Sequence, residues 1–349
     1  MKKIKIAQIG MGHDHAGVMF AALRRMTDIF EVVGYAEVPE DDLDYISSKE
    51  HYKNSLWAYE GAKKYTVEEI LSMRDLDAVT VETYDLNLVK YAQKAADKGL
   101  HIQMDKAAGE NAEEFENLLK TVKEKKLVFN MGYMYRFNPL IRQAFERVQK
   151  GEIGRVYAVD ADMSCYYSRN KRTWLECFQG GMMQYLGCHL IDLIVRLQGI
   201  PEEIIPYNYA TGADGVQTKD VAFALLKYSG GISTVKSSMI DAGGYVRRHL
   251  IIHGEKGTIQ ICPLEKGEGG PSNISTRMTD YLPSDGWHGV GRTTNSGVFD
   301  RYEGMLSAFA AMIRGERTLE VDLETEARIQ RCLLAANGMQ CDYKAKINL

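Results

Sequence analysis

Three parts of the chain combine residue types that could do chemistry. The run Gly10-Met11-Gly12-His13-Asp14-His15 places two imidazoles and a carboxylate in a glycine turn. Lys106 follows an apolar stretch, and Tyr185, His189 and Asp192 have the spacing of neighbours on one helix face. An imidazole titrates near neutral pH and suits general acid–base work on an alcohol. A lysine can hold a substrate oxygen while charge develops on it.

The glycine turn lies between a predicted strand and a predicted helix. Residues 3–9 alternate apolar and polar side chains and then become apolar, and residues 16–26 carry apolar side chains on one side. The first glycine allows a tight turn, the second lets a pyrophosphate approach, and the helix N-terminus offers N–H groups to the anion. His15 or Ala16 stands where a third glycine is usual. The unit predicts dinucleotide binding, with a cofactor-free α/β domain as the alternative.

A carboxylate follows the second predicted strand, residues 30–36, in the form of Glu37. It lies about 20 residues past the glycine turn, where a ribose-binding acid is expected. Such a carboxylate accepts hydrogen bonds from the ribose 2′-OH and repels a 2′-phosphate. We therefore expect NAD rather than NADP as the cofactor.

The elements that position these residues alternate regularly in the first part of the chain. After the polar segment Val38–Tyr65, for which we expect irregular structure and helix, helices and strands are predicted at 66–73, 77–83, 86–98, 100–104, from Asn111 onward and at 127–131. This alternation predicts a doubly wound parallel sheet. The carboxyl ends of its strands carry the candidate residues on one rim, namely Gly10, Glu37, Thr83 and Lys106.

The pattern changes after residue 130. Strands at 155–166, 220–228, 232–240, 247–253 and 258–262 are joined partly by short glycine turns, which predicts antiparallel pairing. Helices are predicted at 139–150, 182–197, 301–314 and 323–337, and the Gly/Ser/Thr-rich segment 267–295 is expected to be a loop over the site. We expect a first domain at residues 1–130 and a second at 131–349, with the closing helices able to pack back on the first domain.

Composition excludes several classes of protein. The 349 residues are 45% hydrophobic and 26% charged, with a net charge of −4, which gives no reason to expect nucleic acid or an anionic membrane as partner. There is no transmembrane run, and the basic start leads directly into a strand, so we expect no signal peptide. The six cysteines form no CxxC pair and no cluster with histidine, as in a cytoplasmic protein without disulfides or a zinc site.

Several motifs in order resemble the Gfo/Idh/MocA oxidoreductase family over nearly the whole chain. They are the glycine turn, Met104-Asp105-Lys106-Ala107, the run Gly132–Pro139, Gly151–Val156, Gly180–Asp192 and Gly254–Thr258. The resemblance implies an N-terminal Rossmann domain and a C-terminal α/β domain with an open, mostly antiparallel sheet. It also implies NAD(P)-dependent chemistry on a hydroxyl of a sugar, cyclitol or derivative, and a homodimer or homotetramer formed through that sheet.

Three positions depart from the family pattern. The usual Glu-Lys-Pro reads Asp105-Lys106-Ala107, and without the proline we expect a trans peptide bond there. An aspartate usually stands four residues before His189, where this chain has Tyr185. The usual Thr-Pro-Asn reads Thr83-Tyr84-Asp85.

The resemblance gives the candidate residues their roles. Lys106, His189 and Tyr185 are the catalytic candidates; the alternatives are a surface lysine, a core histidine bonded to a carbonyl, and a tyrosine that only lines the pocket. Cofactor contacts are expected from the turn and rim, at Gly10, Met11, Gly12, His13, Asp14, Glu37, Thr83, Tyr84 and Lys106. Substrate contacts are expected at Arg136, Tyr166, Trp174, Asp192 and His288.

Some of these roles have structural alternatives. Asp192 and Arg196, at i and i+4, can form an ion pair that has no part in binding. The aromatic residues Tyr166, Tyr167 and Trp174 can stack on a sugar or belong to the core. The pair His13 and His15 suggests zinc, but no third ligand is evident beside it, so we expect no metal site and place His15 near the nicotinamide.

The sequence therefore predicts an NAD-dependent dehydrogenase or reductase of a carbohydrate-like alcohol. A second hypothesis keeps the cofactor but not the net redox change: transient oxidation of a sugar hydroxyl acidifies the neighbouring C–H and allows a glycosidic substituent to leave. A third hypothesis is a non-catalytic sugar or NAD sensor on the same scaffold.

Overall fold

The computed structural model describes residues 2–39 and 55–349. The chain divides into two compact units. The first comprises residues 1–133, 302–330 and 346–349, and the second comprises residues 134–301 and 331–345. Among the described residues, no helix has the length and apolar character that a membrane crossing requires.

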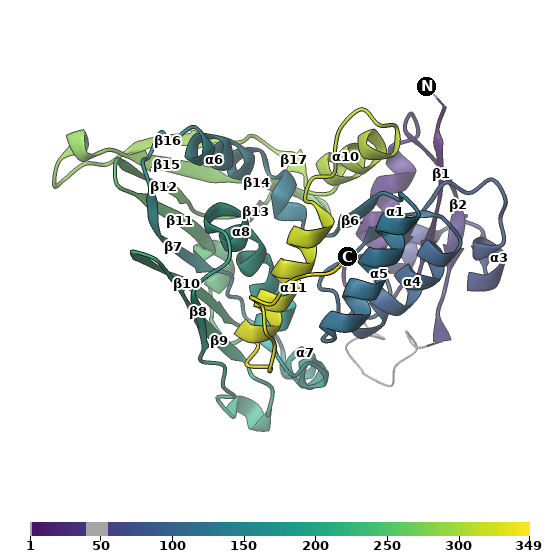
Figure 1. The fold of residues 1–349 in the computed structure, drawn as a ribbon, viewed down its shortest axis with the longest axis horizontal. Coiled ribbons are helices and arrows are strands. Elements are labelled where there is room, and N and C mark those ends of the chain that lie inside the picture. Colours follow the sequence, from purple (N-terminus) through teal and green to yellow (C-terminus); the bar gives the residue numbers. More distant parts are fainter. Residues whose placement is uncertain (1, 40–54) are drawn as a thin grey trace. The chain divides into compact units, whose positions relative to one another are not determined.

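The first unit is built on a six-stranded sheet in the order β3-β2-β1-β4-β5-β6 (Figure 1). Every neighbouring pair is parallel. The strands are β1 (Ile4–Ile9), β2 (Phe30–Ala36), β3 (Lys64–Tyr65), β4 (Ala78–Val81), β5 (His101–Met104) and β6 (Phe129–Met131). This order confirms the predicted Rossmann-type doubly wound sheet and places the β1–β4 crevice beside the glycine turn.

Helices connect the parallel strands. They are α1 (Ala16–Arg25), α3 (Val67–Leu71), α4 (Leu88–Asp97) and α5 (Ala112–Glu124), with short 3-10 turns η2 (Leu56–Tyr59) and η3 (Asp85–Asn87). Thr66 forms the predicted capping box with Glu69, and Asn111 accepts from two backbone N–H groups at the start of α5. Later in the chain, α10 (Glu303–Ile313) belongs to the first unit, whereas α11 (Leu323–Ala336) is divided between the units after Gln330.

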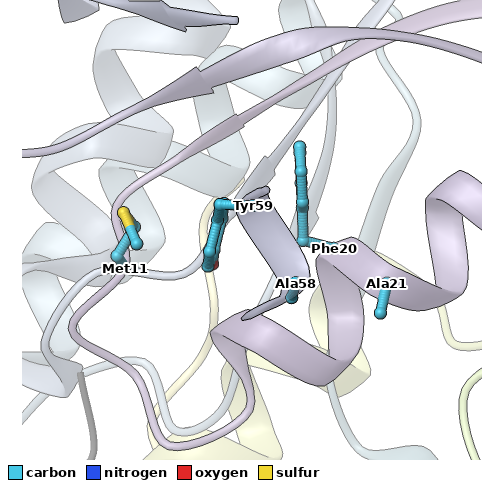
Figure 2. Close-up of a cluster of buried hydrophobic side chains, with 5 residues drawn as sticks. All are labelled: Met11, Phe20, Ala21, Ala58 and Tyr59. Atoms are coloured by element: carbon cyan, nitrogen blue, oxygen red, sulfur yellow. The ribbon is translucent and has the colours of Figure 1, made fainter. Parts of the chain in front are cut away.

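A buried cluster holds α1 behind the glycine turn. It contains Met11, Phe20, Ala21, Ala58 and Tyr59, and Figure 2 shows these side chains between α1 and the 56–59 turn. The Phe20 and Tyr59 rings stack with their centroids 4.7 Å apart, and the Tyr59 hydroxyl accepts from the Gln8 amide at 2.6 Å. The cluster thereby fixes the start of α1 against β1, which sets the path of the turn between them.

The second unit is built on an eight-stranded sheet in the order β16-β15-β12-β11-β7-β10-β9-β8 (Figure 1). Only the β10–β7 pair is parallel, so the prediction of a mostly antiparallel sheet is confirmed. The strands are β7 (Val156–Asp162), β8 (Glu203–Pro206), β9 (Val221–Tyr228), β10 (Gly231–Ser238), β11 (His249–Gly254), β12 (Gly257–Ile261), β15 (Arg277–Tyr281) and β16 (Arg292–Asn295).

Helices and short turns complete the second unit. They are η4 (Met134–Phe137), α6 (Pro139–Gln149), α7 (Arg169–Trp174), η5 (Leu175–Cys177), a π-helical turn η6 (Met183–Gly187), α8 (Cys188–Gln198), η7 (Ala213–Gly215), α9 (Gly244–Arg247) and η8 (Pro283–Asp285). Helix α8 packs against β7, β10 and η4. The predicted helix 182–197 is therefore present, but its first turn is π-helical.

Segments 267–295 and 38–65 were both expected to be at least partly irregular. The expected loop at 267–295 is wrong, because this segment contains β15, β16, β14 (Asn273–Ser275) and the end of β13 (Lys266–Gly267). β15 pairs with β12 and extends the large sheet, while β13 and β14 form a small sheet with β17 (Phe299–Asp300). Of the polar segment 38–65, residues 40–54 lie outside the described residues.

Candidate functional site

The glycine turn has a backbone that only glycine fits at its first position. Gly10 has φ +91°, and a Cβ built there would lie 2.6 Å from Thr83 at the end of β4. The turn is also bonded to β4, since the His13 N–H donates to the Glu82 carbonyl at 3.0 Å. Helix α1 begins at Ala16, directly after the turn. Gly10 thus lets the chain turn tightly beside Thr83, as the first glycine of a dinucleotide-binding turn does.

The His13 side chain points away from solvent and contacts residues that follow β5. It is fully buried, and its Nδ1 lies 3.0 Å from Asp105 Oδ2 after β5. Its Nε2 lies 3.0 Å from the Lys106 carbonyl oxygen and 3.5 Å from Asp85 Oδ1. Burial opposes a charged imidazole, but the carboxylates of Asp105 and Asp85 outweigh it and raise the pKa of His13 well above its ordinary value. We predicted a backbone contact to cofactor here, and the structure gives the side chain a separate set of partners.

His15 faces the same carboxylate from the other side. Its Nδ1 lies 3.0 Å from Asp105 Oδ2, and its ring lies 5.9 Å from the ring of Tyr302. The side chain keeps 18% of its surface exposed, whereas His13 and Asp105 are closed off. Burial lowers the pKa of His15, and the charge of Asp105 partly opposes this. His15 is therefore the accessible member of the group.

A further carboxylate, that of Glu82, lies close to His13. Glu82, at the end of β4, is fully buried, and neither of its carboxylate oxygens has a hydrogen-bond partner among the residues described. Its Oε2 lies 4.0 Å from His13 Nδ1. Burial, followed by the negative charge of Asp105, raises the pKa of Glu82 well above its ordinary value. Asp105 behaves in the opposite way: burial disfavours its charge, but His13 and His15 hold its pKa well below the ordinary value.

Lys106 is 1% exposed, so it is not the surface lysine of the alternative reading. Its backbone N–H donates to Asp105 Oδ1 at 2.7 Å. The Lys106–Ala107 peptide bond is cis, so the expectation of a trans bond was wrong. The Lys106 N–H bond to Asp105 and the Gly109 N–H bond to the Ala107 carbonyl close this turn without a proline.

The predicted ribose carboxylate lies at the end of β2 and has a cationic partner. Glu37 Oε2 accepts from Lys64 Nζ at 2.6 Å, and the Glu37 side chain is 35% exposed. Thr83 and Tyr84 follow β4, and both are buried. The Thr83 hydroxyl donates to the Tyr84 carbonyl at 3.1 Å. The sequence placed Gly10, Glu37, Thr83 and Lys106 at the ends of β1, β2, β4 and β5, and the structure does the same.

In the second unit, His189 lies at the start of α8 and is 1% exposed. Its ring meets the Tyr135 ring edge to face, with centroids 5.0 Å apart. Burial, and then the charge of Glu265, raises the pKa of Tyr135 well above its ordinary value, so Tyr135 keeps its hydroxyl proton. Tyr185 lies on the π-helical turn that precedes α8, a deviation often found at functional positions.

Tyr185 belongs to an aromatic cluster. Its ring contacts those of Trp174, Phe178 and Tyr167, at centroid distances of 5.8, 6.5 and 6.1 Å. Lys171 Nζ lies 3.7 Å from the Trp174 ring centroid and 4.9 Å from that of Tyr185. The cluster places the candidate Trp174 beside Tyr185. Tyr166, the other aromatic candidate, is 62% exposed, and the cluster contains its neighbour Tyr167 instead.

Arg136 and Asp192, both predicted to contact substrate, are bonded to each other. Arg136 Nε donates to the Asp192 carboxylate at 3.0 and 3.1 Å, and Nη2 donates at 2.7 Å. Both side chains are buried, so this pair fixes α8 on η4. The carboxylate of Asp192, for which a pair with Arg196 was suggested, is bonded to Arg136, and the Arg196 guanidinium lies over the Phe145 ring.

His288 lies on the connection between β15 and β16 and is exposed, as is the neighbouring Trp287. It was predicted on a loop that covers the site. That segment is instead the end of an edge hairpin of the large sheet.

Several partners were missed by sequence reasoning. Asp105 was noted only as a substitute for glutamate, although its position before Lys106 was a signal that it shares the rim. It supplies the third donor beside the two histidines: the donor atoms of His13, His15 and Asp105 all lie within 4.8 Å of one another. The contacts of Lys64, Tyr135 and Lys171 could not be predicted from the sequence, because each residue reaches its partner only through the fold.

Known proteins resemble this chain in sequence and in fold. Residues 141–260 match the GFO/IDH/MocA C-terminal domain. The 2,7-anhydro-N-acetylneuraminate hydratase of Escherichia coli is 25% identical over 203 residues, which are 56% of this chain and 54% of that protein. The chain thus spans about half the length of this relative. D-xylose 1-dehydrogenase (NADP(+)) 2 of Haloferax volcanii is 24% identical over 268 residues, 76% of this chain and 78% of that protein.

A solved structure shows the same fold. The UDP-N-acetylglucosamine 3-dehydrogenase of Acidithiobacillus ferrooxidans superposes with a TM-score of 0.70 over 97% of this chain and 98% of that chain. The two sequences are 17% identical, so this likeness concerns the fold alone.

Proposed function

We propose that the chain is a member of the Gfo/Idh/MocA family of oxidoreductases and that it oxidises or reduces the hydroxyl-bearing carbon of a sugar, cyclitol or related compound with NAD(P). The observation that carries this proposal is the buried Lys106 at the end of β5, in the same parallel sheet whose β1 ends in the glycine turn. Gly10 fits a dinucleotide, since its conformation and its approach to Thr83 leave no room for a side chain. When bound, the nicotinamide would accept or donate the hydride.

The residues of the chain have separate tasks in this proposal. Lys106 holds the reacting oxygen and stabilises the charge that develops on it. His189 takes or returns the hydroxyl proton, because an imidazole can exchange protons near neutral pH. Tyr185 contacts the substrate by its hydroxyl, and a phenol cannot replace the usual carboxylate as a partner for a charged His189.

We propose NAD as the preferred cofactor because Glu37 ends β2. Lys64 reduces this preference for NAD. Its ammonium lies 2.6 Å from the Glu37 carboxylate and could also pair with the 2′-phosphate of NADP. The Haloferax relative is named as NADP(+)-dependent.

The redox-neutral reaction remains the second candidate. It is favoured by a relative named as a hydratase of an anhydro sugar and by Tyr185 in place of the usual carboxylate. In this reaction the same lysine and histidine act, but the hydride returns to the substrate after a neighbouring substituent has left.

A substrate panel separates these functions. The protein is incubated with NAD or NADP and with sugars, cyclitols and glycosides, while reduced nicotinamide and products are measured in parallel. Net reduced nicotinamide supports the first function, and product without net reduction supports the second. Binding of sugar or dinucleotide with no chemistry on any compound would contradict both and favour a sensor.

A further inference from the structure

The group formed by His13, His15 and Asp105 has a geometry that the proposed oxidoreductase chemistry does not use. Asp105 Oδ2 lies 3.0 Å from Nδ1 of both histidines, and the donor atoms of the three residues lie within 4.8 Å of one another. Around a zinc ion with bonds of about 2.0–2.2 Å, neighbouring ligand atoms are about 3–3.6 Å apart. Both histidine–carboxylate distances therefore match the edge of a metal coordination shell.

The ring orientation of His13 is that of a metal ligand. Its Nε2 faces the Lys106 carbonyl at 3.0 Å, and because a carbonyl can only accept, Nε2 carries a proton. Its Nδ1 accepts the His15 backbone N–H at 3.2 Å and faces Asp105 at 3.0 Å. At that distance a cation, either a proton or a metal ion, lies between Nδ1 and the carboxylate. Histidines bound to metals commonly donate their other ring N–H to a backbone carbonyl in this way.

The charge around the group also suits a bound cation. Asp105, Glu82 and Asp85 are three buried carboxylates near His13, and the Glu82 oxygens have no hydrogen-bond partner in the described part of the chain. Buried carboxylates are costly unless they are paired or coordinate a metal. Lys106 and protons on His13 and Glu82 balance this charge when no metal ion is bound, and an ion bound at His13 would take the place of its proton.

We propose that His13, His15 and Asp105 bind a divalent transition-metal ion of the zinc type. Two imidazoles and one carboxylate are a ligand set that suits such ions, and three protein ligands leave a position open. The partial exposure of His15 gives the ion an entry path. Glu82 is the adjacent carboxylate that would orient a fourth, water ligand. The ion joins the glycine turn to the end of β5.

The test uses the full-length protein without a histidine tag, stripped with a chelator and titrated with Zn²⁺ by calorimetry. We expect one equivalent to bind, and we expect His15→Ala and Asp105→Asn each to weaken binding about tenfold or more. The matched control is His253→Ala, which removes a partly exposed histidine 4.0 Å from Asp160 and should leave the affinity unchanged. Circular dichroism and thermal unfolding without metal establish that each variant is folded.

A second measurement keeps the proposal testable if a variant fails to fold. Co²⁺ bound to the wild-type protein should give the visible absorption of a site with nitrogen ligands, and X-ray absorption at the zinc edge should show imidazole scattering. No binding by the wild-type protein would overturn the proposal, because a proton would then be the cation between His13 and Asp105. Binding that is lost in His253→Ala but kept in His15→Ala would overturn it as well.

Discussion

Nδ1 of His13 lies 3.0 Å from Oδ2 of Asp105, which binds the turn after β1 to the turn after β5. The first of these turns carries the glycine that approaches β4, and the second carries Lys106. The proposed cofactor site and the proposed catalytic lysine are therefore joined by this contact, together with those of His13 to the Lys106 carbonyl and of His15 to Asp105. Substitutions that break these contacts in either turn should affect both the cofactor site and the position of Lys106.

Gly10→Ala should weaken dinucleotide binding without unfolding the protein. The new Cβ would meet Thr83 at 2.6 Å, and the backbone φ of +91° disfavours any side chain. We expect NADH affinity to fall about tenfold or more, which is about 1.4 kcal/mol or more. Fluorescence titration with NADH measures this.

The control for this change is Gly99→Ala. Gly99 also has a positive φ, +80°, but a Cβ there would meet nothing within 4 Å. It should lose about 1–2 kcal/mol of stability and keep its NADH affinity. Equal NADH affinity in wild type and Gly10→Ala would show that the turn does not hold the cofactor.

Glu37→Gln should shift cofactor preference toward NADP. The change keeps the size of the side chain, removes the charge that repels a 2′-phosphate, and frees Lys64 to pair with that phosphate. We expect the ratio of NADPH to NADH affinity to rise about tenfold. Glu31→Gln, on the same strand and half exposed, is the matched control. An unchanged ratio in Glu37→Gln would remove Glu37 from the cofactor site.

Asp192→Asn should destabilise the protein rather than only weaken substrate binding. It leaves the buried Arg136 guanidinium without its charged partner, and breaking such a pair costs about 3–5 kcal/mol. Denaturant unfolding measures the loss. Removing the exposed Arg155–Glu255 pair should cost only about 0–1 kcal/mol. A stable Asp192→Asn with reduced substrate affinity would instead restore the substrate-binding role predicted from the sequence.

Stability should fall in mild acid partly because of His101. Its Nδ1 accepts the Val128 N–H at 2.9 Å, so a proton on Nδ1 would break this bond. Burial lowers the pKa of His101, while Asp77 partly opposes the shift. The stabilising contribution is present above the unfolded-state pKa, about 6.5, and is lost as pH falls through the lower folded-state pKa.

His101→Asn isolates this contribution, because an asparagine oxygen can accept from Val128 but does not titrate. We expect the free energy of unfolding to decline less below about pH 6.5 in the variant than in the wild type. The partly exposed His249→Asn should follow the wild type. Identical pH dependence in His101→Asn and wild type would contradict the assignment.

The sequence predicted what depends on local signals. Helix starts at Thr66 and Asn111 and the alternation around β1, β2, β4 and β5 each follow from a few neighbouring residues. The rim position of Lys106 follows from the same alternation, because parallel strands share one end. The family resemblance rested on motifs of the same local kind.

What the sequence did not predict depends on pairings between distant elements. The i,i+4 spacing of Asp192 and Arg196 suggested a pair, but η4 brings Arg136 to Asp192 instead. Segment 267–295 was expected to be a loop because it is rich in small polar residues, yet pairing of β15 with β12 makes it sheet. The meeting of His15 with Asp105 likewise requires the register of β1, β4 and β5, which no local pattern contains.

The most direct measurement of the proposed oxidoreductase function is the turnover of Lys106→Met on the substrate that the panel identifies, with NADH binding measured on the same samples. Lys98→Met, at the exposed end of α4, is the control. We expect Lys106→Met to bind NADH as the wild type does and to lose about 100-fold or more in turnover, because the group that stabilises charge on the oxygen is gone. Turnover near the wild-type rate in Lys106→Met would contradict the proposed catalytic role.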